Sequence, residues 1–181
     1  MLYGPNERSH RDANVLVECP DLVDGRLAFI SSGYNRGAAL LDMTATAAQV
    51  VWANKEMQNQ LNSSVKIGPY VYGFSGNDTG EVELKCIEFA TGQPRWSSPG
   101  LGLGSLMAAG ERLIILSADG ELLIADASPD EFRPTARAKV LTGKCWTVPV
   151  LANGNIYCRN AAGELVCINV QSATSSESTK E

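Results

Sequence analysis

A hairpin-containing unit recurs four times along the chain at a nearly constant interval. Gly25, Gly68, Gly110 and Gly154 each open a hairpin, so the successive spacings are 43, 42 and 44 residues. Each unit holds two stretches in which apolar side chains alternate with polar ones, and Gly, Asn or Asp marks the turn between them. Alternation with a period of two predicts β-strands. No helical periodicity persists for a dozen residues, so helical repeats of similar length are excluded.

A period of about 40–50 residues made of short strands is typical of one four-stranded blade of a β-propeller. We therefore expect an all-β chain with about four antiparallel blades, arranged as an open or partial ring. Extending each hairpin by one strand on either side predicts blades at residues 15–53, 64–97, 104–138 and 147–170. A polar segment, residues 1–14, precedes the blades. The polar composition of the tail, residues 171–181, predicts disorder.

Trp52 and Trp96 lie 44 residues apart, in step with the repeat, near the ends of two predicted outer strands. A large aromatic side chain at that place can fill the space between neighbouring blades and bury a large apolar area. We expect both tryptophans to have this packing role rather than to contact a ligand.

The last unit supplies only three strands before the polar tail begins. Two sources for its missing outer strand are open: the apolar residues Val15, Leu16 and Val17, or sequence upstream of Met1. We favour the upstream source because the N-terminal residues as far as Asn14 are polar. The chain would then be a C-terminal portion of a larger propeller.

Composition limits the possible functions. A net charge of −5 disfavours nucleic-acid binding, which normally uses a basic surface. No apolar run approaches the roughly 18 residues of a membrane helix, and no signal peptide is recognisable. The five cysteines form no CxxC pair, so we expect buried thiols rather than a zinc ribbon. His10 is the only histidine, which disfavours a Ser-His-Asp triad.

The segment 85–96, which reads KCIEFATGQPRW, resembles the repeats of pyrroloquinoline-quinone-like (PQQ-like) propellers. In those repeats an apolar strand runs into a Thr-Gly turn, here Thr91 and Gly92, and a Trp follows. The third and fourth units resemble later repeats of the same family. The resemblance covers residues 15–170. It implies an exported, periplasmic bacterial protein related to quinoprotein dehydrogenases and to the non-catalytic outer-membrane assembly lipoprotein.

The chain departs from the enzymes of that family. They carry a disulfide between adjacent cysteines, and some carry a haem attachment site, whereas neither feature is present in this sequence. Their calcium ion and catalytic Asp cannot be placed on it. We therefore expect a binding or scaffold module without catalytic or metal-binding residues, whose protein or small-molecule ligand is unknown. The alternative is part of a PQQ-dependent dehydrogenase that oxidises alcohols or sugars, for which the resemblance implies PQQ and calcium.

Candidate binding residues lie in the loops that would converge on one edge of the blades, where binding sites are frequent. They are polar or aromatic residues of three loops: Tyr34, Asn35 and Arg36; Asn59 and Gln60; Lys144 and Trp146. Arg36 and Lys144 could hold an anion, and Trp146 could stack on a planar ligand. The competing interpretation is that the charges are solvated and that Trp146 fills space between blades. A second chain completing an eight-blade ring is a further possibility.

Overall fold

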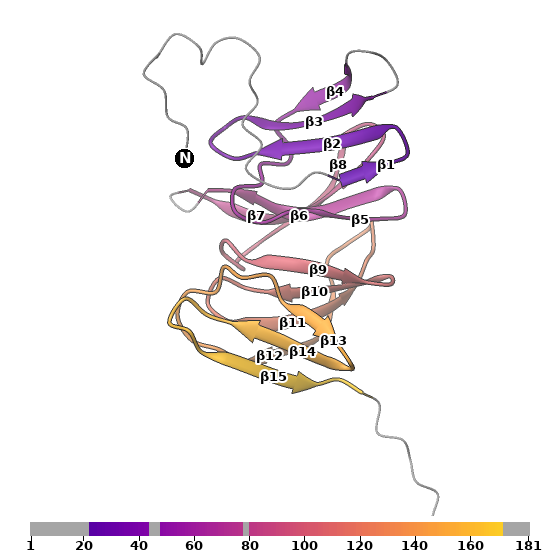
Figure 1. The fold of residues 1–181 in the computed structure, drawn as a ribbon. Coiled ribbons are helices and arrows are strands. Elements are labelled where there is room, and N and C mark those ends of the chain that lie inside the picture. Colours follow the sequence, from indigo (N-terminus) through magenta and orange to yellow (C-terminus); the bar gives the residue numbers. More distant parts are fainter. Residues whose placement is uncertain (1–21, 44–47, 78–79, 172–181) are drawn as a thin grey trace, which may run out of the picture.

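The computed structural model describes residues 22–43, 48–77 and 80–171, which form fifteen strands and no helix (Figure 1). The first sheet contains β1 (Leu22–Asp24), β2 (Leu27–Ser32), β3 (Gly37–Asp42) and β4 (Gln49–Asn54). The second contains β5 (Val65–Ile67), β6 (Tyr70–Gly76), β7 (Val82–Glu88) and β8 (Pro94–Pro99). The third contains β9 (Ser105–Ala109), β10 (Arg112–Leu116), β11 (Glu121–Asp126) and β12 (Pro134–Lys139). The fourth contains β13 (Val150–Ala152), β14 (Asn155–Arg159) and β15 (Leu165–Asn169).

Every sheet is an antiparallel meander in which each strand pairs with its neighbour in sequence. This confirms the prediction of an all-β chain built from about four propeller blades. The described part of the last sheet has three strands, as the sequence predicts. The sheets stack in chain order, so that the first and fourth lie at opposite ends of the stack (Figure 1). No strand pairing joins these two end sheets within the described ranges.

The turns between the first two strands of each sheet explain the regular spacing of the glycines. They also show that the equivalent position in the fourth sheet is one residue earlier than the sequence indicated. In the first three sheets only the opening glycine of this turn has a positive φ, which is 60° at Gly25 and 56° at Gly68. This is the pattern of a type II′ turn. In the fourth sheet both turn residues have a positive φ, 50° at Asn153 and 72° at Gly154, as in an Asn-Gly type I′ turn. The equivalent of the earlier glycines is therefore Asn153, not Gly154.

Successive residues of one strand face opposite neighbours in the stack. In β6, Val71 packs with first-sheet residues such as Leu40, whereas Tyr72 packs with Leu113 of the third sheet. In β10, Leu113 faces the second sheet and Ile114 faces the fourth. This is the period-two alternation of a strand, with both faces apolar because both are covered. Three apolar layers result, one at each joint between consecutive sheets.

The outer strands carry a second kind of contact across these joints. The Trp52 Nε1–H of the first sheet donates a hydrogen bond to the carbonyl of Phe89 in the second, at 3.0 Å. One sheet later, the Trp96 Nε1–H donates to the carbonyl of Ser128, at 2.8 Å. Each acceptor lies in the turn between the third and fourth strands of the following sheet. Each indole therefore packs as an apolar body while its one polar group is satisfied.

The Thr-Gly turn of the second sheet is the place where Trp52 inserts. Gly92 has a φ of 71°, and a Cβ at this position would lie 2.7 Å from the Trp52 ring. The Asn54 side-chain amide donates to the Gly92 carbonyl at 2.9 Å. Glycine is required here both by the left-handed backbone and by the close approach of the preceding sheet.

Several sequence-based expectations concern residues outside the described ranges. These are the N-terminal segment 1–14 with His10, the candidate strand 15–17, and residues 172–181 of the tail. They remain predictions.

Replacing Gly92 by Ala tests whether the Thr-Gly turn holds two sheets together. We expect Gly92→Ala to lower the free energy of unfolding by about 1–3 kcal/mol more than Gly143→Ala does, because the new methyl group overpacks against Trp52. Gly143 is a matched control, because it has the same φ of 71° and no atom within 4 Å of an added Cβ. Urea denaturation measures both values. Equal losses would show that only backbone strain matters at Gly92.

Candidate functional site

The loops that the sequence predicts to contribute to binding lie together at one edge of the stack. Antiparallel strands alternate in direction, so the turn after the second strand and the linker after the fourth emerge at the same edge of each sheet. We call this the loop edge. In the described part of the chain it comprises residues 33–36, 55–64, 77 and 80–81, 100–104, 117–120, 140–149 and 160–164.

The turn 33–36 of the first sheet adopts an unusual backbone conformation at the loop edge. Tyr34 and Asn35 have φ values of 54° and 63°, and left-handed conformations are uncommon for residues other than glycine. Three contacts hold the turn in place. The Tyr34 amide donates to Asn77 Oδ1 at 2.8 Å, Gln60 Nε2 donates to the Tyr34 hydroxyl at 2.9 Å, and Lys55 Nζ donates to Asn35 Oδ1 at 3.0 Å.

This turn presents its side chains to solvent. The Tyr34 residue is 58% exposed, although its hydroxyl accepts a hydrogen bond. Asn35 and Arg36 are exposed as well. A rigid turn therefore displays an aromatic ring beside a guanidinium group, with the exposed Lys55 ammonium bound to the same turn.

Asn59 and Gln60 are buried, in contrast to the turn above them. The Asn59 side-chain amide donates to the Phe74 carbonyl at 3.0 Å, and its oxygen accepts from Ser64 Oγ at 3.0 Å. A Cβ on Gly73 would lie 2.1 Å from Ser64 Oγ, so this strand glycine makes room for the pair. Asn59 therefore attaches the linker 55–64 to β6.

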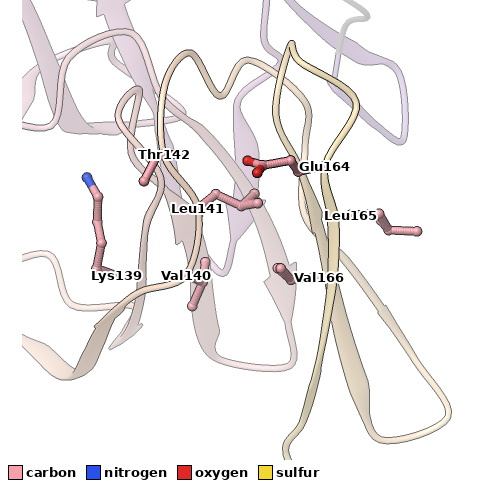
Figure 2. Close-up of a pocket in the computed structure, with 7 residues that line it drawn as sticks. All are labelled: Lys139, Val140, Leu141, Thr142, Glu164, Leu165 and Val166. Carbon is pink, nitrogen blue, oxygen red and sulfur yellow. The ribbon is translucent and has the colours of Figure 1, made fainter.

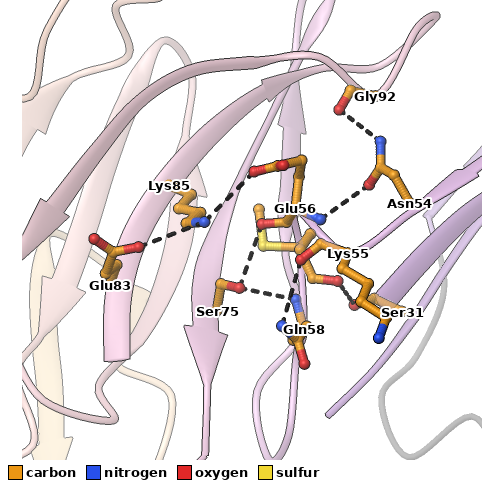
Figure 3. A network of polar contacts seen from close by, with 10 residues as sticks. Ser31, Asn54, Lys55, Glu56, Gln58, Ser75, Glu83, Lys85 and Gly92 are labelled. Atoms are coloured by element: carbon orange, nitrogen blue, oxygen red, sulfur yellow. Dashed lines mark hydrogen bonds and ion pairs between the residues drawn. The ribbon is translucent and has the colours of Figure 1, made fainter. Parts of the chain in front are cut away.

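A second polar network holds the other half of that linker (Figure 3). The Gln58 amide donates to Ser75 Oγ at 3.0 Å, and that hydroxyl donates to the Glu56 carbonyl at 3.3 Å. Lys85 Nζ lies 3.6 Å from the carboxylate of Glu56 and 3.4 Å from that of Glu83. Sequence reasoning missed Lys85. Lys85 shares its face of β7 with Glu83 and Ile87, so strand alternation alone does not single it out.

Lys144 and Trp146 lie together at the joint between the third and fourth sheets. The Lys144 ammonium stands 4.0 Å from the centre of the Trp146 ring, which is a cation–π contact. Between them, Cys145 is buried, and its amide donates to the Ala118 carbonyl at 2.8 Å. The structure therefore divides the candidates into two groups, one around Tyr34 and one around Trp146, with the second and third sheets between them.

A shallow, open depression of about 530 Å³ lies beside β15, in the sheet for which the sequence predicts only three strands (Figure 2). Its lining residues come from the end of β12 with the following linker and from the start of β15: Lys139, Val140, Leu141, Thr142, Glu164, Leu165 and Val166. At its rim, Lys139 Nζ lies 2.6 Å from Asp119 Oδ2, and this hydrogen bond lowers the pKa of the Asp119 carboxyl. The depression thus lies between the linker that follows the third sheet and β15, which is an edge strand of the fourth sheet.

The residues in the described ranges do not fit PQQ and calcium as the dehydrogenases hold them. Four cysteines are described, and all are free: Cys86, Cys145 and Cys158 are buried, whereas Cys167 is exposed. No group of three or more His, Cys, Asp or Glu residues gathers in these ranges. The adjacent cysteines of those enzymes therefore have no counterpart among the residues described, and their calcium ion has no clustered acidic ligands there. Within the described ranges, no helix is long and apolar enough to span a membrane.

The Asn59 contacts predict a large loss of stability on substitution. We expect Asn59→Ala to lower the free energy of unfolding by about 1–3 kcal/mol, because the Phe74 carbonyl and the Ser64 hydroxyl lose buried partners. Gln49→Ala, at an exposed strand position, is the control and should change it by less than about 0.5 kcal/mol. Chemical denaturation measures both. A neutral Asn59→Ala would show that the linker is held without this side chain.

Thiol labelling tests the burial of the cysteines. Desolvation raises the pKa of Cys86 and of Cys158 from 9.0 to about 11, so both thiols stay protonated at about pH 8. In a Cys19→Ser background, a chromogenic disulfide reagent should modify Cys167 quickly and the other three only after unfolding. The raised pKa values of Cys86 and Cys158 also predict a contribution to stability that is complete below pH 9. This contribution is lost as the pH rises from 9 to about 11, because these thiols ionise first in the unfolded chain. Fast labelling of a second thiol would contradict this burial.

Protein-family models and curated proteins give no match to this chain. Solved structures do. BamB from Moraxella catarrhalis is 19% identical with a TM-score of 0.63, over 83% of this chain and 44% of BamB. The computationally designed protein Ika4 is 14% identical with a TM-score of 0.62, over 91% and 95% of the two chains. A europium-containing methanol dehydrogenase is 14% identical with a TM-score of 0.50, over 65% and 24%.

The chain thus spans less than half the length of BamB and about a quarter of the methanol dehydrogenase. At these identities the likeness concerns the fold. The fold is that of a β-propeller of the kind found in BamB and methanol dehydrogenase, as the resemblance to PQQ-like repeats predicts.

Proposed function

We propose that this chain is a binding module of a propeller scaffold, and that the turn 33–36 at the loop edge contacts a protein partner. The observation that carries the proposal is the conformation of this turn. Two consecutive non-glycine residues are held at positive φ, and the first, Tyr34, is largely exposed. With the Arg36 amide donating to the Gly33 carbonyl at 3.1 Å, this is a type I′ hairpin turn that carries two residues other than glycine at its central positions.

The exposed groups of the turn suit a protein surface. Tyr and Arg are enriched among the residues that dominate binding energy at interfaces. Tyr34 supplies a large amphipathic ring, and Arg36 supplies a fork of donors that matches a carboxylate. Lys55 adds a second cation beside them, on a chain whose net charge is −5. We propose that the partner presents an acidic segment to this turn.

The setting of this module follows from the family resemblance. BamB shares its fold, and the resemblance to PQQ-like repeats implies an exported, periplasmic protein. We propose that location for this chain, together with a protein partner rather than a cofactor. The alternative of a quinoprotein dehydrogenase is not favoured, because the described cysteines and carboxylates do not fit its cofactor.

Selection of random peptides displayed on phage tests the proposed surface. We expect the selected peptides to be enriched in Asp and Glu. Arg36→Glu should weaken their binding by at least about tenfold, since an interface hot spot is worth about 2 kcal/mol or more.

Arg133→Glu is the matched control for this selection. Arg133 is also an exposed arginine, with 78% of its side chain accessible, but it lies at the edge opposite the loop edge. Its substitution should leave binding unchanged. Peptides that bind wild-type protein and Arg36→Glu equally well would contradict the proposed surface.

A further inference from the structure

Within each of the first three sheets, one row of side chains packs against the following sheet. The row crosses the sheet from the first strand to the fourth, through residues that are direct partners in the strand register. Its members are Leu22, Phe29, Leu40 and Trp52 in the first sheet; Val65, Tyr72, Cys86 and Trp96 in the second; and Met107, Ile114, Ile124 and Ala136 in the third. Nearly all of them belong to the apolar layer of the joint that follows.

The fourth sheet carries the same row, but no described sheet follows it. The register pairs Val150 with Tyr157, and Tyr157 with Cys167. Val150 is 54% exposed, and Leu165 on the same face is 65% exposed. The opposite face of this sheet, with Ile156, packs against the third sheet in the usual way. The row of Val150, Tyr157 and Cys167 is therefore like that of a joint without a partner, although the same face also carries the exposed Arg159 beside Leu165.

The first sheet also carries apolar residues on the face that points away from the second sheet. In the third sheet, Leu113 and Ile115 face the preceding sheet. The equivalent residues of the first sheet, three and five positions after the opening turn residue, are Ala28 and Ile30. Ala28 pairs with Leu41, and Ile30 pairs with Ala39. Leu41 pairs in turn with Val50, which is 65% exposed. Apart from Ser32 at the end of β2, the residues named on this face are apolar, and no described sheet precedes it.

We propose that two copies of this chain close a ring, with the fourth sheet of each copy packed on the first sheet of the other. This inference does not depend on the proposed partner of the turn 33–36. The two faces match in size, because the bulky Tyr157 on one would stand against Ala28 and Ala39 on the other. They also match in position, since each is the face that joins consecutive sheets elsewhere in the stack.

The size of such an interface is adequate. A face of five residues by four strands covers about 300 Å² at the usual strand spacings, and one of three strands about 240 Å². Two joints, each with one face of either kind, give roughly 1,100 Å² before the added surface of the side chains is counted. This exceeds the minimum of about 1,000 Å² expected of a biological interface. Four sheets from each copy make eight. BamB, of which this chain spans 44%, shows that a chain about twice as long carries this fold.

The symmetry of this arrangement makes it self-limiting. Each joint is head to tail, and two identical joints related by a twofold axis leave no free sheet face. A closed ring stops at two copies, whereas joints that do not close would continue into a filament.

Sedimentation of the full chain tests the ring. We expect a species of twice the chain mass of 19.3 kDa at concentrations from about 1 to 100 µM, without larger polymers. Val150→Asp should raise the dimer dissociation constant at least tenfold while near-ultraviolet circular dichroism still reports a folded chain. Leu61→Asp is the matched control, because Leu61 is 48% exposed in the linker 55–64, away from both faces, and should not change it. A monomer at all concentrations, or a filament, would overturn the proposal.

Cross-linking places the two faces without perturbing them by charge. In a Cys19→Ser background, Ala39→Cys should be joined to the native Cys167 of the second copy by a short bismaleimide. Ala90→Cys, in an exposed turn at the opposite edge, should give no dimer with Cys167. Mass spectrometry of the cross-linked peptides identifies the pair. A dimer whose cross-links from Cys167 avoid residue 39 would disprove this joint.

Discussion

Burial of apolar side chains between consecutive sheets is the interaction on which the rest of this structure depends. A short antiparallel sheet of this size cannot bury enough surface alone. The second and third sheets share both faces with neighbours, and the first and fourth share one face each with a described sheet. Leu113 and Ile114, adjacent in β10, serve two different joints. The indoles of Trp52 and Trp96 reinforce the joints at the outer strands, where each finds a carbonyl of the next sheet.

The loop edge depends on these joints. The linker 55–64 directs polar groups toward the sheets, where Asn59 binds β6 and Gln58 binds Ser75. It therefore supports the turn 33–36 while that turn stays exposed. Glycines at places of close approach, such as Gly73 below Ser64, allow this packing. A rigid support beneath a small exposed surface is the arrangement in which loops on a scaffold serve recognition.

Much of this architecture could be predicted from the sequence because strand alternation and turn glycines are local signals. The repeat spacing matches the four described sheets except at Gly154, because a type I′ turn places glycine one residue later than a type II′ turn. The candidate site was less predictable. Asn59 and Tyr34 look alike as polar loop residues, yet one is buried and the other is exposed. That difference depends on contacts between segments distant in sequence, such as Gln60 with Tyr34 and Asn59 with Phe74, which composition does not encode.

The meander topology has a consequence for how the molecule assembles. Each sheet is formed by neighbouring strands joined by short turns, and each joint links units adjacent in the chain. Strand pairing within each sheet joins segments close in sequence, so folding can start at any of the hairpins and spread in both directions. The two central sheets, supported on both faces, would then be the most resistant to amide exchange, and the stack would open from its ends inward.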